Sequence, residues 1–132
     1  TAAAIGAVGV VRRDPMAMKP FCGYNFADYW THWLSVGAKL KHPPKIFHVN
    51  WFRRDAAGKF LWPGYGDNLR VLAWMLERCA GQGGATETPI GYLPRATDLN
   101  LAGLDIDPAA VTELLSVDRA LWKEEAAGIR KD

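Results

Sequence analysis

The chain has 132 residues, 49% of them hydrophobic and 11% aromatic, which suits one domain with a real core and excludes wholesale disorder. Its formal charge of +2 comes from 16 basic and 14 acidic residues scattered along the chain. So small a charge gives no reason to expect a nucleic acid or a membrane surface as a partner.

The two cysteines and the apolar first residues bear on the cellular compartment. Cys22 and Cys79 form no CxxC or other metal-ligand spacing, and each reads as a small core residue in a reducing compartment. The sequence leaves a disulfide between them open. Residues 2–11 are too short an apolar run to span a bilayer, and the charges after them are misplaced for a signal peptide. We therefore expect a soluble, cytoplasmic protein.

The two ends of the chain suggest a piece of a longer protein. Thr1 is not an initiator residue, and residues 122–132 read as a helix that is still running, with no Gly or Pro stop after Ile129. We expect a fragment that is cut at both ends.

The first third of the chain predicts a strand and a helix. Residues 5–11 are an apolar run with β-branched side chains, typical of a buried strand, and Asp14-Pro15 ends the run. A helix is predicted from Asn25 to about Val36, with Gly37 where a helix commonly ends, because its apolar side chains share one stripe. The stripe consists of Phe26, Tyr29, Trp30, Trp33 and Leu34.

The middle of the chain predicts an aromatic-rich hairpin. Residues 45–52 alternate between two faces, as a strand does, and residues 59–62 would return as the partner strand. Between them, residues 55–58 read as a turn in which Gly58 is available for the left-handed position.

A helix is predicted directly after the hairpin. Asp67 is a good N-cap for a helix that runs through Arg70 to Ala80, and Gly81 is its stop. The apolar stripe of this helix consists of Leu69, Leu72, Ala73, Leu76 and Cys79 or Ala80.

The last third of the chain predicts shorter elements. Residues 82–88 read as a loop of small residues, and residues 88–93 read as a short strand. Asp107 with Pro108 pairs an N-cap with a proline at the first helical position, so a helix through about Ser116 is expected. Asp118 would cap another helix. Because strands and helices alternate without an internal repeat, the predicted class is mixed α and β (α/β).

No catalytic constellation can be recognised in the sequence. It contains no GxxxxGK[ST] phosphate loop and no GxSxG serine, and the three histidines, His32, His42 and His48, show no metal-ligand spacing. The aspartates mostly precede turns or helices, where capping explains them. We therefore expect neither a catalytic residue nor a metal ligand in this chain, which looks chemically incomplete by itself.

Aromatic side chains crowd between positions 51 and 65, on irregular backbone beside a helix N-terminus. For Trp51 and Trp62, packing in the core is the favoured interpretation. The spacing of Phe52, Phe60 and Tyr65 also suits a slot for a flat ligand such as a nucleotide base, where each stack contributes on the order of 1–3 kcal/mol. Choosing guanine over adenine would need a donor and acceptor at the base edge, such as the amide of Asn68.

The same residues resemble the GTP-dependent phosphoenolpyruvate carboxykinases. The resemblance runs through nearly the whole chain and is carried by RDPMAMKPFCGYNFADYWTHWLS (13–35), KIFHVNWFRRDAAGKFLWPGYGDNLRVLAWM (45–75), TPIGYLP (88–94) and DLNLAGL (98–104). It implies that the chain is a single fragment, residues 1–132, of the C-terminal nucleotide-binding domain of a larger enzyme, with an aromatic-rich hairpin followed by a helix.

The resemblance also implies an activity and a nucleotide-binding role. The family converts oxaloacetate and GTP to phosphoenolpyruvate, CO₂ and GDP, a step of gluconeogenesis, and uses Mn²⁺ or Mg²⁺. Residues 45–68 would be the guanine-binding segment. Two sets of residues are implied to bind the nucleotide. The rings around guanine would be Phe52, Phe60 and Tyr65. The run at the edge of the base would be Tyr65, Gly66, Asp67 and Asn68. Many members have Phe where Tyr65 stands.

Other parts of the active site are implied to lie outside this chain. Thr1, Ala2, Ala3 and Ala4 look like the tail of the family's Ω-loop lid, which would exclude water and protect the reactive intermediate. The phosphate loop, the metal ligands, the reactive cysteine and the substrate-binding arginines would precede Thr1. The fragment alone is therefore expected to be inactive, and its parent is expected to be a monomer.

Two other interpretations compete with the enzyme fragment. The chain could be a stand-alone, non-catalytic module that binds a purine nucleotide or a protein through the same aromatic side chains. The aromatic side chains could also be purely structural, with all of them buried.

Overall fold

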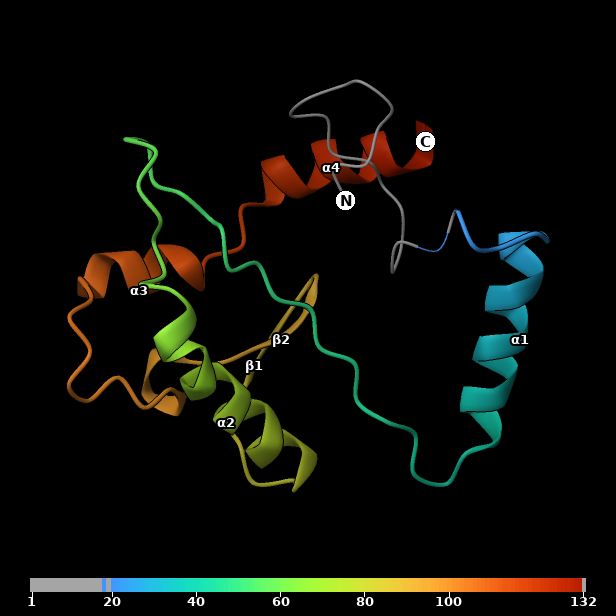
Figure 1. Cartoon of the computed structure of the whole chain (residues 1–132), viewed down its shortest axis with the longest axis horizontal. Coiled ribbons are helices and arrows are strands. Elements are labelled where there is room, and N and C mark those ends of the chain that lie inside the picture. Colours follow the sequence, from blue (N-terminus) through green and yellow to red (C-terminus); the bar gives the residue numbers. More distant parts are fainter. Residues whose placement is uncertain (1–17, 19, 132) are drawn as a thin grey trace. The chain divides into compact units, whose positions relative to one another are not determined.

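The structure, a computed structural model, describes residues 18 and 20–131. The predicted strand at 5–11 and the predicted lid residues, Thr1 to Ala4, lie outside the described residues. The elements in chain order are helix α1 (Phe26–Lys39), the 3₁₀ turn η2 (Tyr65–Asp67), helix α2 (Asn68–Cys79), strands β1 (Thr86–Thr88) and β2 (Gly91–Leu93), the 3₁₀ turn η3 (Ala96–Asp98), and helices α3 (Pro108–Leu114) and α4 (Arg119–Lys131) (Figure 1).

Helices with a small two-stranded sheet confirm the predicted mixed α and β class. The chain divides into two compact units, one of residues 1–44 with 123–132 and one of residues 45–122, called the central unit below. Among the described residues, no helix is both long enough and apolar enough to cross a bilayer. Cys22 and Cys79 are free thiols.

Helix α1 begins where the sequence predicts but ends later. Asn25 caps it, since its side-chain oxygen accepts a hydrogen bond of 2.8 Å from the N–H of Ala27. The predicted end at about Val36, before Gly37, is three residues too early, because the helix continues to Lys39 and the N–H of Leu40 closes it on the Gly37 carbonyl. Aromatic rings pair along the helix at i, i+4, with centroids 6.2 Å apart for Phe26 and Trp30.

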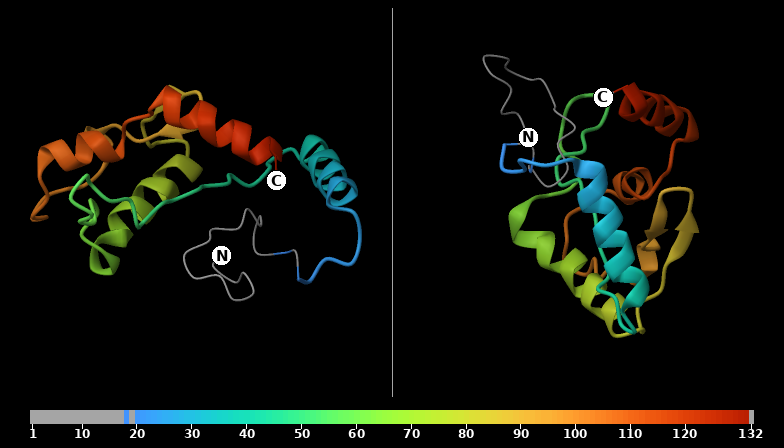
Figure 2. Two further views of the ribbon diagram at one scale, coloured as in Figure 1. Left: turned by 90° about the horizontal axis from the view of Figure 1, so that it is seen from above. Right: turned by 90° about the vertical axis from the view of Figure 1, so that its right-hand side faces the viewer.

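The two strands predicted for the aromatic hairpin are reduced to a single β-bridge. Residues 45–50 carry no strand assignment and are drawn as plain coil in Figures 1 and 2. The bridge joins Arg54 to Phe60. An alternating pattern indicates that a segment can lie on a half-buried surface, but a strand also needs a hydrogen-bonded neighbour. Within residues 18 and 20–131, no strand pairs with the segment 45–50. The predicted turn at 55–58 is present, and it forms the tip of the hairpin.

Helix α2 begins at Asn68, directly after Asp67, as the sequence predicts, but without the expected side-chain cap. Asp67 precedes the helix, but its side chain makes no capping hydrogen bond, because η2 already winds the chain from Tyr65 into Asn68. At the other end Ala80 is the C-cap and Gly81 has φ of 77°, a conformation that favours glycine. The predicted stop at Gly81 is therefore confirmed.

The side of α2 that is buried is not the predicted stripe. Leu69, Leu72 and Leu76 are exposed, whereas Trp74 is only 4% exposed. The indole N–H of Trp74 donates to the Gly84 carbonyl over 2.8 Å. Two sides of this helix carry apolar residues, and periodicity alone does not say which of them meets the rest of the unit.

The short strand predicted at 88–93 is a hairpin. Strands β1 and β2 pair antiparallel, with Thr86 opposite Leu93 and Thr88 opposite Gly91. The chain reverses between them at Pro89 and Ile90, since Pro89 has no N–H for a strand ladder and Gly91 has φ of 116°. The prediction of one strand at 88–93 is therefore wrong, because this stretch contains the turn between β1 and β2.

Helices α3 and α4 confirm the two predicted caps. The Asp107 carboxylate accepts from the N–H of Ala109 at 2.8 Å, with Pro108 at the first helical position. The Asp118 carboxylate likewise accepts from the N–H of Ala120 at 2.8 Å at the start of α4. The most buried hydrophobic side chains of the described residues all belong to the central unit: Leu61, Trp62, Trp74, Leu99 and Val111.

Candidate functional site

The turn at 55–58 is built by one carboxylate. Oδ1 of Asp55 accepts hydrogen bonds of 2.9 Å from the N–H groups of Ala57 and Lys59. Gly58 completes the turn with φ of 81°, and its N–H donates to the Asp55 carbonyl over 3.0 Å. This local chemistry turns the chain back on itself and brings the residues on both sides of the turn together.

The turn sets two phenylalanine rings side by side. The centroids of Phe52 and Phe60 are 6.1 Å apart with an angle of 61° between the ring planes, an edge-on contact. Both rings reach solvent, with 73% of Phe52 and 45% of Phe60 exposed. A base between two rings needs about 7 Å from plane to plane, twice the contact distance between carbon atoms. In this arrangement a base would stack on an outer face, or the pair would have to open.

An arginine covers part of Phe60. The guanidinium carbon of Arg54 lies 4.1 Å from the centre of the Phe60 ring, and its Nη1 donates to the Gly58 carbonyl at 2.8 Å. The cation is attracted to the ring face and is anchored to the turn at the same time. Arg54 therefore steadies Phe60, and a base would stack on the other face of the ring.

The predicted run at the base edge, Tyr65 to Asn68, forms one tight turn. Gly64 enters it with φ of 126° and ψ of −162°, and the N–H of Asp67 donates to the Gly64 carbonyl at 3.1 Å. The Tyr65 side chain is 94% exposed. The N–H groups of Tyr65 and Gly66 belong to the first turn of a helix, where backbone donors have no partner within the helix. They suit an acceptor such as the O6 atom of a purine.

The carboxylate of Asp67 is tied to the protein. Its Oδ1 accepts from Nε of Arg70 at 3.0 Å. Arg70 in turn donates to the backbone carbonyls of Asn100 and Ala102 at 2.6 and 3.0 Å. Through Arg70, the side chain of Asp67 thus joins η2 to the loop at 100–102.

Asn68 is held by a buried tryptophan. Nε1 of Trp62 donates to Oδ1 of Asn68 over 2.8 Å, and Trp62 is only 6% exposed. The ring of Trp51 lies 6.5 Å from that of Trp62, and Trp51 is itself partly buried. The core interpretation favoured for Trp62 is confirmed.

The structure brings together some of the residues predicted to bind the nucleotide and leaves others apart. Phe52 meets Phe60, and Tyr65 to Asn68 share one turn, but in the described part of the chain the Tyr65 ring contacts neither phenylalanine ring. A mostly apolar cavity of about 720 Å³ in the central unit is lined by other side chains, among them Trp51, Trp62 and Trp74. The predicted guanine residues Phe52, Phe60 and Tyr65 are not in its lining.

Two side chains at this site were missed in the sequence. Arg54 lies opposite Phe60 across the bridge, so its contact with the ring could have been inferred from the position of the turn. The bond from Trp62 to Asn68 joins residues six positions apart, outside the i, i+3 and i, i+4 spacing of a helix. No local signal in the sequence marks it.

Ionisable groups at the described positions do not form a metal centre. Within residues 18 and 20–131, no three His, Cys, Asp or Glu side chains gather closely enough to hold a metal ion. The carboxylate with a lowered pKa is Asp98 of η3, which accepts hydrogen bonds from the Arg95 side chain, at 2.8 and 2.9 Å, and from its backbone N–H. This ion pair is at the surface and is structural.

Comparison with known proteins places the chain in a family. The family described as the phosphoenolpyruvate carboxykinase C-terminal P-loop domain matches residues 1–132. A relative from Treponema pallidum (strain Nichols), named phosphoenolpyruvate carboxykinase (GTP), is 58% identical over 127 residues, which are 95% of this chain and 21% of the relative.

Relatives from other lineages carry the same name. The one from Thermoplasma volcanium is 54% identical over 131 residues, covering 99% of this chain and 22% of the relative. The one from Paenarthrobacter aurescens is 56% identical over 133 residues, with the same shares of both chains. The chain thus spans about a fifth of the length of the curated relatives it matches.

Proposed function

The chain belongs to the GTP-dependent phosphoenolpyruvate carboxykinase family, as a segment of its C-terminal P-loop domain, and we propose that it supplies the guanine pocket of such an enzyme. The whole protein would convert oxaloacetate and GTP to phosphoenolpyruvate, CO₂ and GDP. The observation that carries the proposal is the pair of exposed rings, Phe52 and Phe60, held beside each other at the hairpin turn.

The role of the segment would be to orient the nucleotide. Phe60, steadied by Arg54, would stack on the base, and Phe52 would close its edge. The turn of η2 would offer the backbone N–H donors of Tyr65 and Gly66 to the base edge, with the Asn68 amide beside them. Holding the nucleotide in one position lowers the entropic cost of the transfer step, which needs a fixed direction of approach.

The divalent metal of the family finds no ligand set among the described residues. We therefore assign no step to it in this segment. Four further points are predictions from the sequence alone. They are the reaction direction towards phosphoenolpyruvate, as in gluconeogenesis, a cytoplasmic location, a monomeric parent enzyme, and the lid role of Thr1 to Ala4.

Replacing Phe60 in the whole enzyme tests the proposal. Phe60→Ala should raise the KM for GTP roughly 5- to 150-fold, because a lost base stack costs about 1–3 kcal/mol. The KM for oxaloacetate should stay the same. Tyr92→Ala is the matched control, since Tyr92 is 59% exposed and also has an arginine, Arg78, 5.6 Å from its ring.

The measurement is the initial rate of phosphoenolpyruvate formation at varied GTP and saturating oxaloacetate. A Phe60→Ala enzyme with an unchanged KM for GTP would contradict the assignment of the pocket. An equal rise in the KM for GTP in Phe60→Ala and Tyr92→Ala would point to a general effect on folding instead.

A further inference from the structure

The hydrogen bond from Trp62 to Asn68 bears on which base the site accepts. Nε1 of Trp62 lies 2.8 Å from Oδ1 of Asn68, and the tryptophan is 6% exposed. Asn68 is the first residue of α2, so its backbone is set by the helix, while Trp62 is buried in the hairpin. The bond therefore joins the segment that follows the hairpin to the first turn of α2.

A carboxamide is by itself ambivalent. Its oxygen accepts and its nitrogen donates, and a half-turn about the last side-chain bond exchanges the two ends at almost the same shape. The two purines differ at the matching positions, since guanine has an acceptor, O6, where adenine has a donor, N6–H₂. An asparagine free to turn could satisfy either base, and so it would contribute little to the choice between them.

The indole removes that freedom, because its N–H donates and cannot accept. The Asn68 oxygen must face Trp62, and the NH₂ end must face away from it. Turning the amide over would break this bond and set two donors against each other in a partly buried position. The assignment of oxygen and nitrogen in the Asn68 amide thus follows from the chemistry of its partner.

We propose that Trp62 is a positioning residue that fixes the Asn68 amide in one orientation and thereby favours a 6-oxopurine over a 6-aminopurine base. The proposal rests on the function proposed above, in which Asn68 lies at the base edge. With its oxygen held, Asn68 presents N–H donors, which pair with O6 of guanine or hypoxanthine and are opposed by N6–H₂ of adenine.

The first experiment compares three nucleotides with the whole enzyme carrying Trp62→Phe, which removes the N–H and keeps an aromatic ring. The ratio of kcat/KM for GTP to that for ATP should fall roughly three- to tenfold, the worth of one net hydrogen bond. The ratio for GTP to ITP should not change, because hypoxanthine presents the same O6 and N1–H as guanine.

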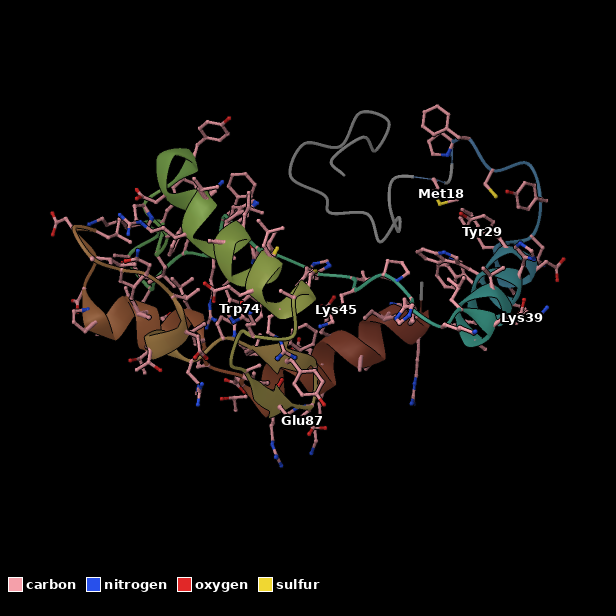
Figure 3. The ribbon with its side chains drawn as sticks, turned by 90° about the horizontal axis from the view of Figure 1, so that it is seen from below. Met18, Tyr29, Lys39, Lys45, Trp74 and Glu87 are labelled. Atoms are coloured by element: carbon pink, nitrogen blue, oxygen red, sulfur yellow. The ribbon has the colours of Figure 1, made fainter. Side chains whose placement is uncertain are left out.

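Trp74→Phe is the matched control. Trp74 is buried to a similar degree, 4% exposed, and its indole also donates over 2.8 Å, but to the backbone carbonyl of Gly84. Figure 3 shows Trp74 on α2, the helix that Asn68 begins. Trp74→Phe removes an equivalent indole hydrogen bond without removing a partner of Asn68. The GTP to ATP ratio of kcat/KM should therefore stay at the wild-type value.

A double-mutant cycle separates positioning from a general structural effect. If Trp62 acts through Asn68, then adding Trp62→Phe to an Asn68→Ala enzyme should not change the GTP to ATP ratio further. A change of the same size in both backgrounds would overturn the proposal. So would an unchanged ratio in folded Trp62→Phe enzyme, or an equal change in Trp74→Phe.

A second variant covers the case in which Trp62→Phe does not fold. Incorporating 3-benzothienylalanine at position 62 replaces the indole N–H by sulfur and keeps the shape of the ring system. The same fall in the GTP to ATP ratio is expected, and an unchanged ratio would overturn the proposal. The Phe60→Ala enzyme separates failure of the proposed pocket from failure of the proposed role of Trp62. A normal KM for GTP in Phe60→Ala refutes the pocket itself. A raised KM in Phe60→Ala, together with an unaltered GTP to ATP ratio in the position-62 variants, refutes only the role of Trp62.

Discussion

Gly64→Ala should destabilise the turn that carries the predicted base-edge residues. Gly64 has φ of 126° and ψ of −162°, a region of backbone conformation that is essentially restricted to glycine. A Cβ built on Gly64 meets no heavy atom within 4 Å, so alanine would cause no clash in packing. The whole cost is backbone strain, about 1–3 kcal/mol.

The strain acts on a small structural unit. The carbonyl of Gly64 accepts from the N–H of Asp67 at 3.1 Å, which is the bond that closes η2. If alanine raises the free energy of this turn by that amount, the open form becomes roughly 5- to 150-fold more populated, at tenfold for each 1.4 kcal/mol. The KM for GTP should rise by up to the same factor.

Hydrogen exchange measured by mass spectrometry on the whole enzyme reports the local opening directly. Peptides that contain the amide of Asp67 should exchange faster in Gly64→Ala by the factor given above. Gly66→Ala is the matched control for stability, because it also has no atom within 4 Å of its Cβ and has no positive φ. Equal exchange rates in the two variants, or a Gly64→Ala enzyme that matches wild type, would refute the reasoning.

Two further predictions concern the surface ion pair of Arg95 and Asp98. Hydrogen bonds from Arg95 lower the pKa of the Asp98 carboxylate below its ordinary value of 3.8, so the stabilisation is present above about pH 4 and is lost as the pH falls through the lowered pKa. The difference in Tm between wild type and Asp98→Asn should therefore be constant above pH 5 and shrink towards pH 2.5, and a difference that grows on acidification would contradict this. Gly84→Ala should lower the stability by no more than about 1 kcal/mol, because its Cβ would displace the mostly exposed end of the Arg95 side chain and lie 2.5 Å from Oδ1 of Asp98, which weakens a surface ion pair. Thermal unfolding checks it, with Gly37→Ala, whose Cβ has open space, expected to be neutral or stabilising.

The sequence alone determined the features that depend on near neighbours in the chain. The caps at Asn25, Asp107 and Asp118 and the stop at Gly81 were all predicted, because each needs only a side chain or a left-handed backbone conformation within a few residues. The turn at 55–58 was predicted for the same reason. The motifs also indicated the family, because long runs of specific residues can be compared with other sequences without knowing the structure.

Only the tertiary structure decided the features that depend on distant partners. Residues 45–52 alternate like a strand, yet a strand forms only beside another strand, and the sequence does not show whether one is there. Likewise, two sides of α2 carry apolar residues, and only the packing of the central unit decides that Trp74 is buried, with its indole N–H donating to the Gly84 carbonyl.

The candidate site shows the same division. The sequence predicted the residues from Phe52 to Asn68 as a set, but not that Arg70 would hold the Asp67 carboxylate or that Trp62 would turn the Asn68 amide. Side-chain identity is written in the sequence, whereas the direction in which an amide or a carboxylate points is set by whichever donor the fold brings within hydrogen-bond distance.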